Sequence, residues 1–582
     1  MATKFLTNPV GNPVKKTSKR AYSEPEVENP SLVLERILAG KTQVEHVEFY
    51  DTTLRDGNQA VGVNFSVEDK LKISRRLSDF GVEIIEGGWP SAANPSEAEF
   101  FKRVKSERLD AALSVVGATR KPNCRPERDQ NVEALVSVEA DYATLVGKSW
   151  RFHVEKILDT TLEENLRMIA DSTEYLKNHG YRVIFDAEHF FDGFKEDPKY
   201  AMQTLEAAAK AGASTMVLCD TRGSSIPSEV YEVTGYVSSS VDKPVGIHVH
   251  NDRGLATANS LSAVMAGAKH FQGTVNGIGE RCGNANLIEF IANLEFSLGY
   301  KTGLDLTKLT QLSDYVYEIA NLKRNNYIPF VGRYAFAHKA GIHGHAVLRL
   351  TRAYENIDPG LVGNARMIPV SSQAGLANIT ARAQELGFTL DRTDPKARSL
   401  LLKIKEMEAA GYNLENANAT LHLLYARNLG ERLDYFDLVN WRAFVTGENG
   451  GVRSESTVKL TVDGKSSITA EEGNGPVNAF DTALRRALEV HYPELSKVRL
   501  VGYRVREIDV ERGTAAAVRV FTEFEGEGMS WSTVGVSTNI LKASEEALID
   551  GYIYFLYRTR EGRTSRLSGG VTLEGARPKA GP

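Results

Sequence analysis

Residues with catalytic potential gather in two short stretches about 200 positions apart. The first, FYDTTLRDGNQ (49–59), is an apolar run that leads into Arg55 and Asp56. The second, GIHVHND (246–252), carries His248 and His250. Because side chains alternate between the two faces of a strand, both imidazoles should point the same way. Together with a distant carboxylate they could bind a divalent metal and leave positions open, although an isolated pair of this spacing is more often a core or surface feature.

The elements that must position these residues alternate regularly between strand-like and helix-like patterns. Eight such units within about 250 residues match a TIM (β/α)8 barrel better than a doubly wound open sheet, which usually has fewer strands. The expected strands are residues 47–50, 82–85, 112–116, 142–146, 182–185, 215–219, 245–250 and 270–275.

Polar side chains recur at or just beyond the ends of these expected strands. A closed barrel brings every strand end to one rim, and in TIM barrels the carboxyl-terminal rim carries the active site. The sequence therefore predicts an active site assembled from Arg55, Asp56, Glu86, Glu188, Thr221, His248, His250 and Asn284.

Composition narrows the class of protein. A length of 582 residues predicts two to four domains, and a formal net charge of −5 disfavours nucleic acid as a partner. No apolar run approaches the ~18 residues of a membrane span. Three cysteines cannot build a disulfide framework, which indicates a reducing, cytoplasmic location. Residues 1–45 predict a disordered or partner-clasping arm, with weak organellar targeting as the alternative.

Beyond the barrel (46–301), the pattern changes twice. Residues 302–429 are predicted to form helical linker subdomains, and residues 430–572 an α+β domain that precedes a free tail, 573–582. Strands are expected at 457–462, 498–505 and 516–523, and similar helices open at 478 and 542. Two strand–helix units in tandem indicate a pseudo-symmetric repeat. The start of each helix either binds an amino acid's carboxylate or is a simple tight turn.

Three motifs in this sequence resemble the signatures of the isopropylmalate/homocitrate/citramalate synthase family: DTTLRDG (51–57), HVHND (248–252) and GERCGN (279–284). The resemblance extends over about residues 47–557. IEGGWP (85–90), DAEHFFDG (186–193) and AFAHKAGIH (335–343) are similar to the (R)-citramalate synthase branch of the family.

The resemblance implies an acyltransferase that condenses acetyl-CoA with a 2-oxo acid, which is pyruvate in the citramalate branch of isoleucine biosynthesis. It implies a divalent ion (Mg²⁺, Mn²⁺ or Zn²⁺) bound by Asp56, His248, His250 and Asn284. Arg55 would stabilise the developing alkoxide, and Glu188 or His343 would remove a proton. The remaining implied site residues are Tyr354 as an orienting group or donor and Gln59, Glu86, Trp89 and Thr221 as substrate contacts.

The family also implies a homodimer or higher homo-oligomer, in which the linker covers the partner's barrel and the C-terminal regulatory domain binds an amino-acid effector, isoleucine. Three alternatives remain open. The first is the same reaction on a larger 2-oxo acid, giving isopropylmalate or homocitrate. The second is a lyase or aldolase, which the C-terminal domain disfavours. The third is a non-catalytic metabolite sensor, which the intact polar set disfavours.

Overall fold

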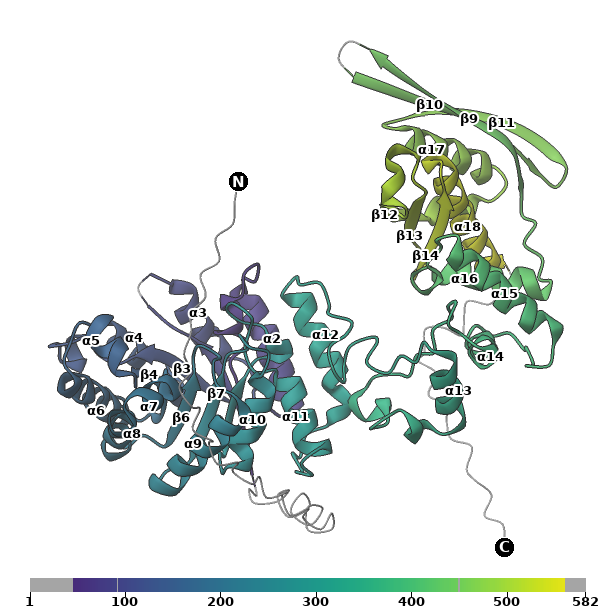
Figure 1. Cartoon of the computed structure of the whole chain (residues 1–582). Coiled ribbons are helices and arrows are strands. Elements are labelled where there is room, and N and C mark those ends of the chain that lie inside the picture. Colours follow the sequence, from purple (N-terminus) through teal and green to yellow (C-terminus); the bar gives the residue numbers. More distant parts are fainter. Residues whose placement is uncertain (1–45, 92, 449–450, 561–582) are drawn as a thin grey trace, which may run out of the picture. The chain divides into compact units, whose positions relative to one another are not determined.

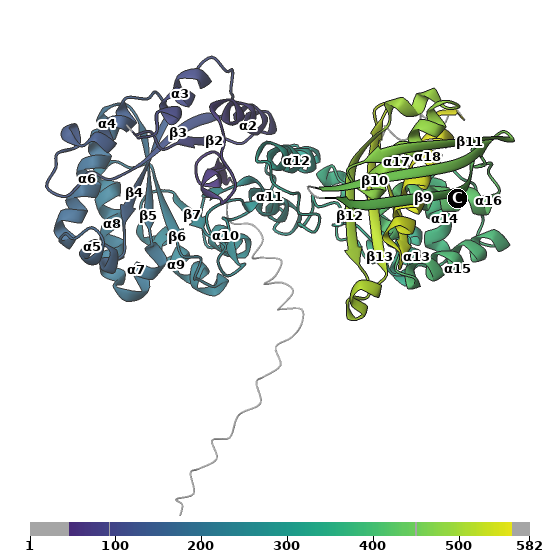
Figure 2. The ribbon, with the colours of Figure 1, turned by 90° about the horizontal axis from the view of Figure 1, so that it is seen from above.

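The computed structural model describes residues 46–91, 93–448 and 451–560 (Figures 1 and 2). These form two compact units, of which the first runs to Asp305 and includes Leu312–Lys323. The second comprises Leu306–Gln311 and the chain from Arg324 onward. The expected N-terminal arm, 1–45, and tail, 573–582, lie outside the described residues.

The first unit is a closed barrel of eight parallel strands in sequence order, which confirms the predicted fold. The barrel closes where β8 pairs with β1, with His270 beside Glu48 and Gly273 beside Asp51. Strands β1 to β6 run past their expected ends, and among them β4 reaches Lys148 and β5 reaches Glu188. The strands are β1 (Glu48–Asp51), β2 (Ile84–Gly88), β3 (Ala112–Ala118), β4 (Tyr142–Lys148), β5 (Arg182–Glu188), β6 (Thr215–Asp220), β7 (Val245–Val249) and β8 (His270–Gly273).

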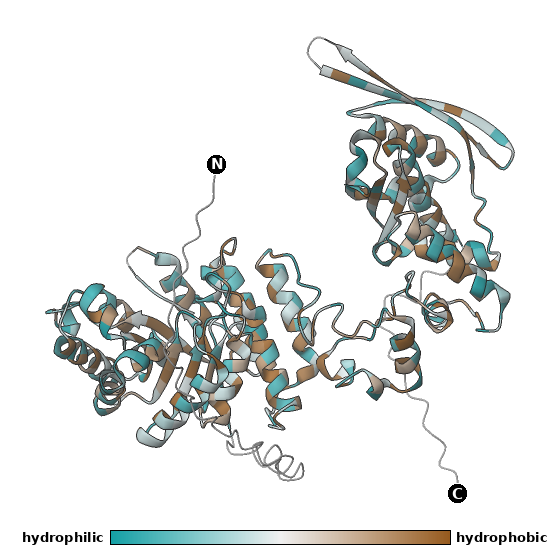
Figure 3. Ribbon diagram, in the orientation of Figure 1, coloured by the Kyte–Doolittle hydropathy of each residue, from teal (hydrophilic) through white to brown (hydrophobic). Residues whose placement is uncertain are grey.

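An outer helix follows each strand, and clear capping signals delimit the first of them. Ser66 and Asp69 form a capping box at the start of α2, and Gly81 ends it with a φ of 102°. Figure 3 shows hydrophobic residues concentrated in the barrel strands, whereas the outer helices alternate hydrophobic and hydrophilic positions. The helices are α2 (Val67–Phe80), α3 (Pro95–Val104), α4 (Gln130–Val136), α6 (Leu162–Asn178), α8 (Pro198–Ala211), α9 (Pro227–Ser240), α10 (Ala256–Met265) and α11 (Leu287–Phe296), with short α5 (Arg151–Lys156) and α7 (Phe190–Glu196) after β4 and β5.

Polar groups as well as apolar ones fill the barrel interior. Tyr50 packs with Ile84, Ile184 and other apolar strand residues. Its hydroxyl lies 2.7 Å from Thr144 Oγ1, which in turn lies 2.9 Å from Ser114 Oγ. Buried hydroxyls that bond to one another satisfy the polar requirement of a core without water.

The second unit begins with helices and ends in a tandem repeat. Each half of the repeat is a three-stranded antiparallel sheet followed by a helix, which confirms the predicted tandem of strand–helix units. The sequence analysis missed three of the six strands, β9, β11 and β14; β11 contains no fully buried residue. Helix α12 (Leu309–Ile319) begins in the second unit, but most of it belongs to the first. The other elements of the second unit are α13 (Gly341–Arg349), α14 (Leu376–Glu385), α15 (Pro395–Ala409), α16 (Asn418–Leu429), β9 (Asp437–Glu448), β10 (Gly451–Val462), β11 (Lys465–Gly473), α17 (Pro476–Glu489), β12 (Arg499–Glu507), β13 (Val518–Gly526), β14 (Met529–Ser537) and α18 (Ile540–Arg560).

A buried ion pair ties two outer helices to the end of β2. Lys70 Nζ of α2 lies 2.7 Å from both carboxylate oxygens of Glu97 of α3 and 3.0 Å from the carbonyl oxygen of Gly87. The two side chains are only 3% and 7% exposed. A Cβ at Gly88 would lie 1.5 Å from Glu97 Oε2, so glycine is required for this close approach.

We expect Lys70→Met to destabilise the barrel by about 3–5 kcal/mol, because it leaves the Glu97 carboxylate buried without a counter-charge. Arg75→Ala is the matched control, since it breaks the more exposed Arg75–Glu107 pair and should shift the unfolding midpoint far less. The thermal unfolding midpoints of the two variants test this. Equal shifts would show that burial of the Lys70–Glu97 pair has no consequence.

Candidate active site

The loop after β1 is held in place by an internal carboxylate. Asp51 accepts hydrogen bonds from the backbone N–H and the hydroxyl of Thr53, at 2.9 and 2.7 Å. The Thr53 hydroxyl oxygen also accepts a bond from the Val275 N–H beyond β8. Burial raises the pKa of Asp51 to about 7. Asp51 is therefore a structural group that fixes the turn presenting Arg55 and Asp56.

Arg55 is bound between two carboxylates. Its Nε and Nη2 donate to the two oxygens of Glu86, and its Nη1 lies 3.2 Å from Asp56 Oδ1. The Glu86 side chain is fully buried, whereas that of Arg55 is 14% exposed. Glu86 was predicted to contact the substrate. In the structure it is instead the partner that orients Arg55.

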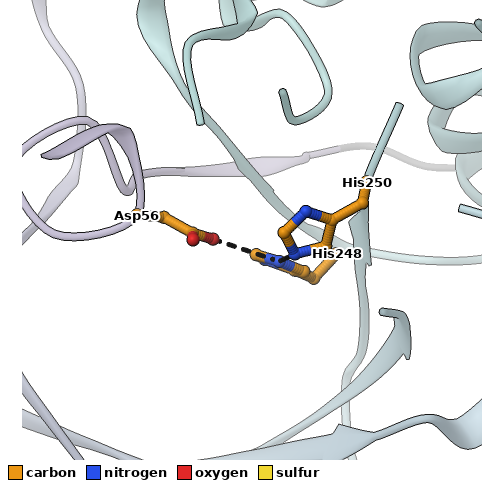
Figure 4. Close-up of side chains that lie close together, drawn as sticks. All are labelled: Asp56, His248 and His250. Carbon is orange, nitrogen blue, oxygen red and sulfur yellow. Dashed lines mark hydrogen bonds and ion pairs between the residues drawn. The ribbon is translucent and has the colours of Figure 1, made fainter. Parts of the chain in front are cut away.

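Asp56, His248 and His250 converge at the carboxyl-terminal rim (Figure 4). One ligand atom from each lies within 4.8 Å of the others. His248 Nε2 is 3.3 Å from Asp56 Oδ2 and 3.4 Å from His250 Nε2. Strand alternation in β7 and the closed barrel thus bring together the residues that the sequence predicted as a cluster.

Asn284 completes this cluster. Its Nδ2 donates to Asp56 Oδ2 at 2.7 Å, while its Oδ1 is buried without a hydrogen-bond partner. A Cβ at Gly279 would lie 2.2 Å from that oxygen, so the glycine makes room for the amide. A buried acceptor without a partner is costly unless something binds it. The orphaned oxygen, one carboxylate and two imidazoles form a donor set that fits a divalent cation.

The protonation states favour a cation as well. Burial would raise the pKa of Asp56, but Arg55 and the two histidines lower it to about 2. Burial lowers the pKa of His248, and burial and the neighbouring His248 lower that of His250 to about 3. At neutral pH the cluster therefore offers one ionised carboxylate and two neutral imidazoles, the forms that bind metals.

Glu188 lies at the end of β5 beside a residue that the sequence analysis missed. Lys148, its register partner at the end of β4, forms an ion pair with Glu188 Oε2. Both side chains are about a quarter or less exposed. The missed signal was a lysine at a strand end, which was overlooked because β4 was expected to stop at Val146.

The other predicted substrate contacts occupy different settings around the rim. The Thr221 hydroxyl oxygen accepts a 2.8 Å bond from the His189 N–H, so it fixes the backbone after β5. Trp89 is half-buried after β2, and Gln59 is exposed in a short 3-10 helix, Gly57–Gln59. Arg281 bridges the loops by donating to both oxygens of Asp252 and to the Thr221 carbonyl oxygen.

His343 and Tyr354 belong to the second unit. Their ring centroids are 4.3 Å apart, and the Tyr354 side chain is about half exposed. The adjacent Glu355 is buried, and its two carboxylate oxygens accept hydrogen bonds of 2.6 Å from Arg366. His338 Nε2 lies 3.1 Å from Glu355 Oε1. This clamp holds Tyr354 beside His343.

The barrel also buries an acid that the cluster does not use. Asp186, in β5, is fully buried, and burial with the nearby Glu86 raises its pKa to about 8. A folded-state pKa above the unfolded value means that the contribution to stability is complete below about pH 4 and is lost as pH rises through about 8.

We therefore expect Asp186→Asn, measured without metal, to gain stability relative to the unsubstituted protein between pH 4 and pH 8. The gain should be at least about 1.4 kcal/mol, the equivalent of one pKa unit. Thermal midpoints at a series of pH values test this. Thr144→Val removes a buried hydroxyl but no titrating group. It should therefore shift the thermal midpoint equally at every pH and leave the shape of the pH profile unchanged. An unchanged pH profile in Asp186→Asn would contradict a raised pKa.

With this geometry in place, comparison with known proteins identifies the parts of the chain. The HMGL-like family matches residues 46–316, the barrel. The homocitrate synthase post-HMGL domain-like family matches residues 330–411, and the LeuA allosteric (dimerisation) domain matches residues 415–556.

Relatives match over nearly their whole length. The (R)-citramalate synthase of Aquifex aeolicus is 48% identical over 89% of this chain and 99% of that protein. The (R)-citramalate synthase of Geobacter sulfurreducens is 46% identical over 88% of this chain and 98% of that protein. The 2-isopropylmalate synthase of Methanocaldococcus jannaschii is 32% identical over 89% of this chain and 96% of that protein. The chain therefore belongs to the isopropylmalate/homocitrate/citramalate synthase family.

Proposed function

We propose that this chain condenses acetyl-CoA with pyruvate to give (R)-citramalate and CoA. The observation that carries the proposal is near full-length identity of 44–48% to five relatives named (R)-citramalate synthase. The convergence of Arg55, Asp56, His248, His250 and Asn284 at one rim supports a catalytic protein over a sensor that has lost its chemistry.

Asp56, His248, His250 and Asn284 would hold the divalent ion. When bound there, such an ion supplies Lewis-acid polarisation of the ketone of a 2-oxo acid. Arg55, whose charge is fixed by Glu86 and Asp56, would bind the oxygen on which negative charge develops. Glu86 then acts through Arg55 rather than by touching the substrate, because both of its oxygens already bind the guanidinium.

The reaction requires one proton to leave the methyl group of acetyl-CoA. The resulting carbanion forms a carbon–carbon bond to the ketone carbon of pyruvate, and the alkoxide takes up a proton. Water then cleaves the thioester and releases the CoA thiol. The base for the first step is proposed to be Glu188, either directly or through water, or His343 of a partner subunit.

Lys148 bears on this choice. Its ammonium group is paired with Glu188 Oε2, so that oxygen is not free to reach a substrate while the ion pair persists. Glu188 therefore suits the base role once a substrate carboxylate or thioester oxygen draws Lys148 away. Tyr354, stacked near His343, is proposed to orient or donate. Gln59, Trp89 and Thr221 remain proposed substrate contacts on the rim.

We also propose that the protein acts as a cytoplasmic homodimer inhibited by isoleucine. The match of residues 415–556 to an allosteric (dimerisation) domain supports the dimer and regulation by an effector. The edge strand β12 adds support, because Val501, Tyr503 and Val505 are 50%, 37% and 41% exposed on it. Exposed apolar side chains on an edge strand are a surface that a second copy can cover. No described helix is long and apolar enough to cross a membrane.

The substrate assignment predicts a clear preference among 2-oxo acids. Overfilling a pocket costs about 1–3 kcal/mol, so kcat/KM for pyruvate should exceed that for 2-oxoisovalerate by roughly tenfold or more. CoA thiol release from acetyl-CoA with a panel of 2-oxo acids measures this, and isoleucine added to the same assay should inhibit. Arg55→Ala is the negative control, which excludes a contaminating thioesterase.

Other outcomes of that assay would redirect the assignment. Equal kcat/KM for the two acids would defeat the pyruvate assignment. Inhibition by leucine without any effect of isoleucine would place the chain in the isopropylmalate branch of the family. Thiol release that does not depend on any 2-oxo acid would overturn the condensation itself.

A shared active site makes a separate prediction. His343→Ala and Arg55→Ala proteins should each be inactive, yet their hybrid dimers should regain activity, because one site then combines an intact barrel with an intact His343. Co-purification on two affinity tags isolates the hybrid for assay. His345→Ala, an exposed neighbour on the same helix, is the matched control and should retain activity alone. Verified hybrids without activity would show that the site is not shared.

A further inference from the structure

The interior of the barrel contains a chain of hydrogen bonds that runs from its amino-terminal end to the metal-site cluster. Glu48 Oε2, at the start of β1, lies 2.7 Å from His270 Nδ1. His270 Nε2 lies 3.4 Å from Gln272 Nε2, and Gln272 Oε1 lies 3.0 Å from His248 Nδ1. Apart from Glu48, the side chains linked by these hydrogen bonds are almost completely buried.

The first link fixes where the proton of His270 lies. Burial would raise the pKa of Glu48, but its bond to His270 lowers it, so Glu48 is an ionised acceptor. Nδ1 of His270 must therefore carry the proton that Glu48 accepts.

The second link fixes the orientation of the Gln272 amide. Gln272 Nε2 donates to Asp186 Oδ1 at 3.0 Å and lies 3.4 Å from His270 Nε2. The amide nitrogen therefore faces these two groups, and its oxygen faces His248. Position 272 could not be occupied by an apolar residue without leaving these partners unbonded.

The third link fixes the tautomer of His248. Since Gln272 Oε1 can only accept, Nδ1 of His248 carries the proton and Nε2 keeps its lone pair. That Nε2 is the atom that faces Asp56 and His250. Partners that hold the outer nitrogen of a ligand histidine typically change metal affinity 10–100-fold.

We propose that Gln272 is a positioning residue that holds His248 in its metal-binding tautomer and orientation, and that Glu48, His270 and Asp186 orient Gln272. The proposal rests on the metal centre of the proposed function. It assigns a role in that centre to a residue of β8 that contributes no ligand.

Binding of Mn²⁺ to the full-length, metal-stripped protein tests this, with the free ion quantified by electron paramagnetic resonance. We expect Gln272→Met, which keeps the length of the side chain but removes its hydrogen bonds, to weaken Mn²⁺ binding about 10–100-fold. Thr144→Val is the matched control, because it removes a buried hydrogen bond inside the same barrel without touching a ligand. The Mn²⁺ dissociation constant of Thr144→Val should stay within about threefold of that of the unsubstituted protein. A change of that size is smaller than the loss of a hydrogen-bond partner of a ligand would cause.

The outcomes separate this proposal from the proposed function. His250→Ala should abolish binding, and if it does not, the metal centre itself is wrong. If His250→Ala loses binding while folded Gln272→Met keeps it within threefold, the positioning role is overturned and the metal centre stands. If Thr144→Val weakens Mn²⁺ binding as much as Gln272→Met does, the positioning role is overturned too. That result would show that loss of any polar group from the barrel interior weakens the site. Should Gln272→Met not fold, Gln272→Asn, which is too short to span His248 and Asp186, is judged by the same criteria.

Discussion

The pairing of β8 with β1 is the constraint on which the site depends. Asp56 and His248 lie 192 positions apart in the chain, yet the closed ring of parallel strands brings their side chains to 3.3 Å. Two further hydrogen bonds join the residues that follow β1 to β8 and to the residues after it. The Thr52 N–H donates to the Gly273 carbonyl oxygen, and the Val275 N–H donates to the Thr53 hydroxyl. The loop bearing Arg55 and Asp56 is thus attached to the last strand as well as to its own.

Closure also concentrates negative charge, and the positions of the few cations follow from that. Asp51, Asp56, Glu86 and Asp186 are all buried within one barrel, and Arg55 is the cation bonded to two of them. Asp51 and Asp186, which lack such a cation, have raised pKa values of about 7 and about 8. Asp56 alone is driven well below its ordinary pKa, to about 2. A single arginine therefore leaves one carboxylate ionised at the rim, and a divalent ion would be its natural complement.

Much of this architecture could be predicted because its determinants are local. Each barrel strand is a short apolar run bounded by turn residues, and some outer helices carry their own start and stop signals, as Ser66 and Gly81 do for α2. The C-terminal sheets were harder to predict for a physical reason. β11 has no fully buried residue, so its sequence lacks the alternation by which a half-buried strand is recognised. Its pairing with β10 is decided by the backbone ladder and by α17, which no local pattern encodes.

The residues of the site also differ in how far local sequence predicts them. Arg55, Asp56, His248 and His250 could be predicted because their chemistry is legible from residue type and from spacing within one strand. Lys148 and Gln272 could not, because their roles exist only relative to other strands. Gln272 on its own is a buried polar residue that any core would have to satisfy. It becomes informative only when its amide nitrogen faces His270 and Asp186, because the oxygen must then face His248. The identity of a ligand can thus be read from a sequence, whereas the proton that prepares the ligand is set by a three-dimensional chain of donors and acceptors beginning at Glu48.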